Sequence, residues 1–195
     1  IFATYSGSIT DNFGMTATYG YDGTTYSGGT IFGNNYPTPD KGVYNPKSNF
    51  TIENGDFIAS DVFISKYSSD GTKMIWTNFI GGGTDYKGAE TVHSLICDKE
   101  NNLYAYGVTS SDNFPTTPSA FQKSNKGGER INIRNNGALF GDFGTDIYTF
   151  KISSDGKNLL GSTLIGGTKN DGLNYNYNGK NTDYQTFVVN LNGKN

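Results

Sequence analysis

The stretch DVFISKYSSDGTK, residues 61–73, decides the fold, because it returns twice further along the chain. It recurs as DIYTFKISSDGKN at residues 146–158 and, more weakly, as DYQTFVVNLNGKN at residues 183–195. A repeat of this size is one supersecondary unit copied along the chain. The repetition therefore predicts a modular scaffold and weighs against a single carved active site.

The repeat extends on both sides of this stretch. The segment IWTNFIGGG at residues 75–83 returns as LGSTLIGG at residues 160–167, and the chain opens on the related IFATYSGS. Upstream, DGTTYSGG at residues 22–29 corresponds to ENNLYAYG at residues 100–107. The second copy is longer than the first, mainly within residues 123–145, and we interpret that segment as a loop insertion.

Each unit contains four short stretches with strand character, which in the first unit lie near residues 14–21, 24–32, 61–67 and 73–80. They are rich in Tyr, Phe, Ile, Val and Thr, which suit a pleated surface. Asp-Gly pairs at residues 22–23, 70–71 and 155–156 predict tight primed hairpin turns, because glycine adopts positive φ without a Cβ clash. No segment of useful length has helical periodicity.

Four antiparallel strands in each repeat, with glycine-rich links, predict an all-β protein of the β-propeller type. A sandwich is the competing fold, but it usually needs about seven strands in roughly 100 residues. The ring is incomplete in this chain, and we divide it as follows: the last strand of a preceding blade at residues 1–8, a blade at 13–83, a blade with the loop insertion at 88–167, and a degenerate or discontinuous blade at 168–195.

Composition excludes several classes of protein. The chain has 195 residues and a net charge of −3, which argues against nucleic-acid binding, since that needs a basic face. The single cysteine, Cys97, cannot form a disulfide within the chain, and its apolar neighbours predict a buried position. No apolar run is long enough to span a membrane.

Three segments resemble the SBBP-type β-propeller repeat of bacterial surface proteins: FIGGGTD at residues 79–85, NNLYAYGVTSSDNFPTTPSAFQ at 101–122 and GTDIY at 144–148. The opening FATYSGS, followed by DNFG at residues 11–14, resembles large surface proteins of gliding Bacteroidota that the type IX secretion system exports. The resemblance implies export across the outer membrane, a cell-surface location, and an adhesive or scaffolding role in gliding motility without a defined reaction.

Candidate chemistry is sparse. His93 is the only histidine, and we interpret it as structural, because zinc sites and catalytic triads need further partners. Asp11, Asp85 and Asp171 follow the links between units, where a turn-stabilising role is favoured over calcium binding. No sequence pattern points to the paired carboxylates of glycoside hydrolysis. We therefore assign no catalytic residue, metal or cofactor.

The insertion carries the basic residues Lys123, Lys126, Arg130 and Arg134, which predict a loop that binds an anionic protein or surface glycan. A merely solvated loop is the alternative. The predicted function is a non-enzymatic scaffold at the cell surface. Its alternatives are an accessory subunit of an outer-membrane secretion or motility complex, and a carbohydrate-active propeller enzyme, in which two acids without structural partners would converge.

Overall fold

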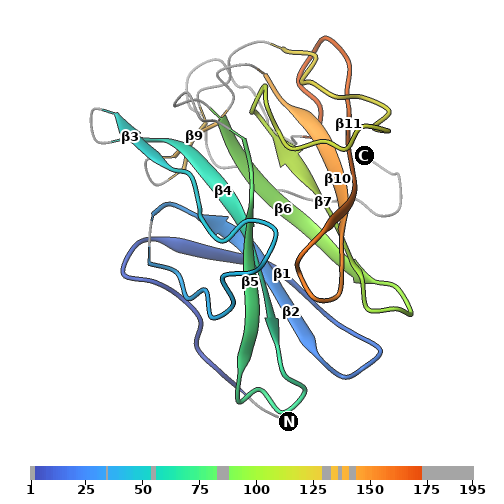
Figure 1. Ribbon diagram of the computed structural model, residues 1–195. Helices are drawn as coiled ribbons and strands as arrows, with labels where there is room; N and C mark the ends of the chain where they lie inside the picture. The colour runs from blue at the N-terminus through green and yellow to red at the C-terminus, as the bar shows by residue number, and fades with distance from the viewer. Residues whose placement is uncertain are drawn as a thin grey trace, which may run out of the picture.

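The computed structural model describes residues 3–33, 35–53, 56–82, 88–128, 133–135, 138–140 and 144–172, and in these ranges every regular element is a β-strand (Figure 1). The predicted all-β class is therefore confirmed. The strands are β1 (Asn12–Tyr19), β2 (Thr25–Ile31), β3 (Thr51–Glu53), β4 (Asp56–Tyr67), β5 (Met74–Ile80), β6 (Gly88–Cys97), β7 (Leu103–Thr109), β8 (Ile133–Asn135), β9 (Ala138–Phe140), β10 (Asp146–Ile152) and β11 (Leu159–Ile165).

Two four-stranded antiparallel meanders make up most of the described chain. Strands β1, β2, β4 and β5 pair in that order and form what we call the first unit, and β6, β7, β10 and β11 form the second unit. A short parallel bridge, Ala59 with Gly88 and Ser60 with Ala89, joins β4 to β6. This bridge connects both units into one mixed sheet that does not close on itself.

The two units repeat each other in register. Ile31 lies opposite Asp61 between β2 and β4, as Thr109 lies opposite Asp146 between β7 and β10. The β1–β2 pair is irregular between Gly14 and Thr16, and the β6–β7 pair is irregular at the same place, between Val92 and Ser94. The sequence repeat is thus a structural repeat down to its β-bulges.

The hairpin turns differ from the predicted primed type. Gly71 and Gly156 have φ of 70° and 74°, but Asp70 and Asp155 are absent from the described residues with positive φ. Gly71 N donates to Ser68 O at 2.9 Å, so the turn spans residues 68–71 and ends in a left-handed glycine. The prediction failed because Asp70 accepts from Thr72 N (3.1 Å) and stabilises a different local turn.

The main core lies between the units, where one face of each meander packs against the other. From the first unit it contains Tyr26, Val43, Val62, Ile64, Trp76 and Ile80, and from the second Val92, Leu95, Cys97, Leu103, Ala105, Phe114, Tyr148, Phe150, Ile152 and Leu164. The buried position predicted for Cys97 is confirmed. A smaller cluster of Ile31, Tyr36, Phe63 and Phe79 lies on the opposite face of the first unit.

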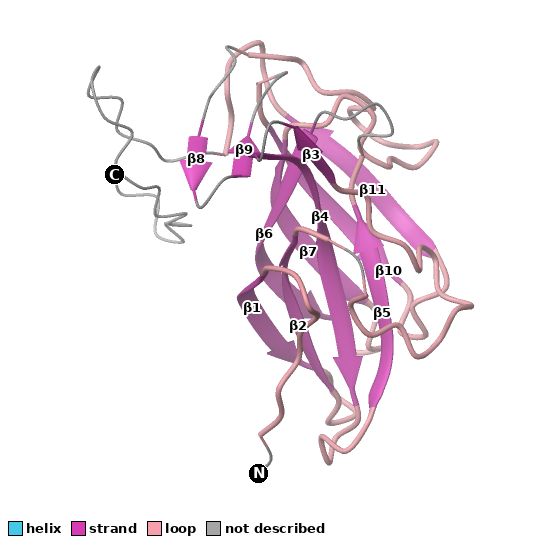
Figure 2. Ribbon diagram, turned by 90° about the vertical axis from the view of Figure 1, so that its left-hand side faces the viewer, coloured by secondary structure: helices cyan, strands magenta, loops and turns pink. Residues whose placement is uncertain are grey.

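The predicted loop insertion at residues 123–145 contains two short strands, β8 and β9, so the description as a loop was wrong in this part. Backbone pairing joins β9 to β4 in parallel through Ala138 and Phe57, and β3 pairs with the same part of β4. All three short strands lie at one end of the molecule (Figure 2). The segments that each unit inserts before its third strand therefore meet each other.

Two domain predictions remain predictions. The last strand of a preceding blade was predicted at residues 1–8, of which residues 3–8 are described and form no strand. In the expected blade at 168–195, residues 173–195 lie outside the described residues.

Candidate functional site

The predicted partner-binding loop is described only at its start. Lys123 and Lys126 are exposed, and Lys126 N donates to Asp146 Oδ2 at 2.9 Å, which ties the loop to the first residue of β10. Arg130 lies outside the described residues, and Arg134 belongs to β8, where side chains are not described. The structure therefore places two of the four predicted cations on one anchored loop.

The isolated candidates remain apart. His93 lies at the bulge of β6, 6.1 Å from the ring of Tyr106, and burial lowers its pKa. Asp171 Oδ2 accepts from Gly167 N at 2.7 Å, which fits a turn-stabilising role. Asp11 belongs to no group of potential metal ligands among the described residues. Asp85 lies outside the described residues. In the described ranges no three His, Cys, Asp or Glu side chains gather as metal ligands.

A pair of buried carboxyl groups that the sequence did not reveal lies where the two units join. Asp61 of β4 is 1% exposed and Glu90 of β6 is fully buried. One oxygen of each, Asp61 Oδ1 and Glu90 Oε2, has no hydrogen-bond partner. Both oxygens lie against Gly81, because a Cβ built there would collide with each of them.

The other oxygen of each acid is well bound. Glu90 Oε1 accepts from Thr109 Oγ1 at 2.6 Å and from Ser111 Oγ at 2.5 Å, and Asp61 Oδ2 accepts from Asn49 N at 2.7 Å. These contacts fix the two side chains in place. Each acid thus has one hydrogen-bonded oxygen, while its other oxygen has no partner and faces the second acid beside Gly81.

Burial raises the pKa of Glu90 to about 7, although the hydrogen bonds from Ser111 and Thr109 lower it. Burial and then the charge of Glu90 also raise the pKa of Asp61. Two adjacent buried carboxylates repel each other, so the folded protein favours a state in which one of them is protonated. Both acids are enclosed, so the pair is not placed to contact a substrate.

Asp61 has a counterpart in the second unit. Asp146 begins β10 as Asp61 begins the repeated part of β4, and it accepts through Oδ2 from Lys126 N and from Gln122 Nε2. Both aspartates therefore hold the backbone of the preceding long segment. The sequence signal for this role was present, because both residues open the repeated stretch, whereas nothing in the repeat pointed to Glu90.

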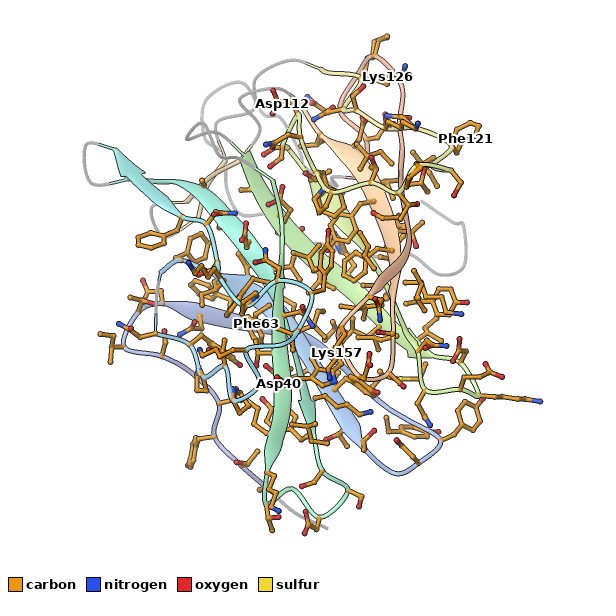
Figure 3. All side chains as sticks on the ribbon, viewed as in Figure 1. Asp40, Phe63, Asp112, Phe121, Lys126 and Lys157 are labelled. Atoms are coloured by element: carbon orange, nitrogen blue, oxygen red, sulfur yellow. The ribbon has the colours of Figure 1, made fainter. Side chains whose placement is uncertain are left out.

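The outer face of the second unit, meaning the side of β7, β10 and β11 that is turned away from the first unit, forms an open hollow. Its volume is about 320 Å³, and its lining includes Tyr104, Phe121, Thr149, Lys151 and Ser162. Lys151 Nζ lies 2.8 Å from Asp98 Oδ2 and 4.8 Å from the centre of the Tyr104 ring. Phe121 projects from the segment between β7 and β10, near the end of the molecule that carries Lys126 (Figure 3).

A scan against protein-family models and a search of curated proteins both found no match to the chain. The described residues contain no helix that could cross a membrane.

Proposed function

We propose that this chain is part of a non-enzymatic β-propeller scaffold at a bacterial cell surface, which binds a protein or glycan partner through its loops. The observation that supports it best is the pair of four-stranded antiparallel units that match in register and pack face to face. Propellers are built by repeating such blades around an axis. The resemblance to SBBP repeats supports the surface location and the link to gliding motility and type IX secretion.

The buried acid pair weighs against the enzyme alternative. A glycosidase needs two carboxyl groups that flank its substrate. Asp61 and Glu90 do come together, but both are enclosed and each is hydrogen-bonded through one oxygen to the protein itself. Their arrangement fits a junction between units better than a cleft.

Partner binding is assigned to the anchored basic loop. Lys123 and Lys126 are exposed, and the second of them extends from a backbone that Asp146 holds. A rigidly supported loop with like charges attracts anionic groups at long range. The proposed partner is therefore an acidic protein surface or an anionic polysaccharide.

The test compares two double variants of the full chain with equal changes in charge. Lys123→Glu with Lys126→Glu reverses the loop, and Lys73→Glu with Lys157→Glu reverses two exposed cations at or beside the hairpin turns. Retention on immobilised surface polysaccharide and on surface proteins from the producing cells is measured at several salt concentrations. We expect only the loop variant to lose retention, and equal behaviour of both would contradict the assignment. Proteolysis of intact producing cells tests the surface location, because an internal protein would resist it.

A further inference from the structure

The outer face of the second unit has an equivalent in the first unit that is fully occupied. Cross-strand pairing defines the equivalence: Lys66 lies opposite Tyr26 and Trp76, and Lys151 lies opposite Tyr104 and Gly161. In the same way Ile80 corresponds to Ile165, since they lie opposite Val62 and Ile147. In the first unit this face packs against the second unit.

Exposure separates the equivalent residues sharply. Tyr26 is 1% exposed and Tyr104 41%, while Ile80 is 1% exposed and Ile165 47%. The largest contrast in exposure is between Val43, at 7%, and Phe121, at 87%. The two are equivalent because Val43 follows Tyr36 at the same distance in the sequence as Phe121 follows the matching Phe114.

Gly161 adds to the contrast, since a Cβ there would meet nothing within 4 Å, whereas its equivalent Trp76 is buried. The outer face of the second unit thus has side chains equivalent to those of the buried face of the first unit, but they are exposed.

The β10–β11 turn occupies this face in the first unit, and the contacts are made to its backbone. Ser154 O accepts from Lys66 Nζ at 3.0 Å and from Trp76 Nε1 at 3.2 Å. Gly156 O accepts from Asn78 Nδ2 at 2.9 Å and from Tyr44 N at 2.8 Å. Because carbonyl oxygens are recognised, a turn with this backbone shape satisfies the site provided that it keeps a glycine at the position of Gly156, where a Cβ would lie 2.8 Å from the Trp76 ring.

We propose that the outer face of the second unit binds the corresponding turn of the third copy of the repeat, residues 183–195. This copy lies outside the described residues, and its Asn-Gly at 192–193 stands where the second copy has Asp155-Gly156. Lys151 is then placed to donate to the carbonyl of Leu191, as Lys66 does to that of Ser154. The inference rests on the proposed stacking of units as propeller blades.

The length of the connection and the composition of the face agree with this occupant. Ten residues, 173–182, lie between Gly172 and Asp183. Fully extended, the chain from Gly172 to Asp183 spans up to about 35 Å, longer than a seven-residue strand at about 23 Å. The face also has Thr149 where the first unit has Ile64, and Gly161 where it has Trp76. Less apolar area is therefore available, so the third copy binds more weakly than the first two units bind each other.

Thiol labelling of the full chain tests the proposal. Phe121→Cys introduces a thiol within the proposed contact, and Leu160→Cys supplies the matched control in the same unit. The control is suitable because Ile75, the equivalent of Leu160, stays 40% exposed in the occupied first unit. Cys97 is a slow internal reference, since burial raises its pKa to about 11. The rates of alkylation by iodoacetamide are followed by peptide mass spectrometry.

We expect the thiol at position 121 to react at least about tenfold more slowly than the thiol at 160, because a docked face reacts only through its open fraction. Gly193→Val should remove this difference and leave position 160 unchanged, since Gly71 and Gly156 have positive φ in the equivalent turns and a β-branched residue disfavours it.

Equal rates at 121 and 160 would overturn the proposal, as would protection that Gly193→Val does not change. Protection that grows with protein concentration would assign the face to a second copy, and protection only upon adding polysaccharide would assign it to a glycan. Each of these results contradicts the assigned occupant. Retention through Lys123 and Lys126 is measured separately, so failure of the proposed function remains distinguishable.

Discussion

Replacing Trp76 by alanine tests the packing between the two units. The ring is 1% exposed, meets Tyr26 edge-on at 5.8 Å and donates from Nε1 to Ser154 O at 3.2 Å. A Cβ on Gly156 would lie 2.8 Å from the ring, so the ring presses directly on the backbone of the turn. The site therefore has little freedom to collapse, and removing an aromatic side chain from such a core costs about 3–5 kcal/mol.

The lost hydrogen bond adds little to this value. Ser154 O also accepts from Lys66 Nζ, so the carbonyl is not left without a donor when Trp76 is removed. Trp76→Phe keeps most of the ring and loses the N–H donor, which corresponds to about 0.5–1.5 kcal/mol for the hydrogen bond together with a smaller packing loss. The two variants thus separate packing from hydrogen bonding.

Urea unfolding followed by far-ultraviolet circular dichroism is the suitable assay, because Trp76 is the only tryptophan and its fluorescence disappears in the variants. Ile75→Ala is the matched control, since the neighbouring Ile75 is 40% exposed, and we expect it to lower the free energy of unfolding by less than about 1 kcal/mol. If Trp76→Ala cost no more than Ile75→Ala, the packing of the units through this ring would be refuted.

Three further predictions concern the same junction. The pKa of Glu90 in the folded protein is about 7, above its usual 4.5, so between pH 4.5 and 7 the folded state holds a proton that the unfolded chain has released. The free energy of unfolding should therefore fall as the pH rises from about 4.5 to 7. Glu90→Gln should flatten this pH dependence, measured as the midpoint of urea unfolding. Gly156→Ala should lower the free energy of unfolding by at least about 1–2 kcal/mol, because of positive φ and contact with Trp76, whereas Gly161→Ala should change it by less than about 1 kcal/mol in thermal melts. Cys97 should react with thiol reagents only at the rate of unfolding, and fast native labelling would show that it is accessible.

The strands were predictable from the repeat because the same local pattern of aromatic and β-branched residues recurs with its turns. The expected segments at residues 24–32 and 73–80 became β2 and β5 with ends shifted by one residue. The turn type was not predictable from Asp70-Gly71 alone, because the hydrogen bonds of the Asp side chain to Ser68 and Thr72 compete with the primed geometry.

Contacts between the units were beyond the sequence. Asp61 and Glu90 meet because β4 and β6 run in parallel for two residue pairs, and a repeat pattern carries no information on which strands of different copies become neighbours. The pairing of β9 with β4 escaped prediction for the same reason, since it brings together Phe57 and Ala138. The basic loop was predictable as a charged segment, but not its attachment through Asp146.

The junction between the units has two ends of opposite character. At one end the apolar core and the contacts of Trp76 and Lys66 with Ser154 hold the units together. At the other end lies the short parallel bridge, beside which Asp61 and Glu90 repel each other unless one is protonated. Each carboxyl group is hydrogen-bonded within its own unit, Asp61 to Asn49 and Glu90 to Thr109 and Ser111, so only the repulsion between the two acids acts across the junction. The pH dependence of folding should therefore reflect the contact between the units, and the apolar end should keep them together when the acidic end becomes charged.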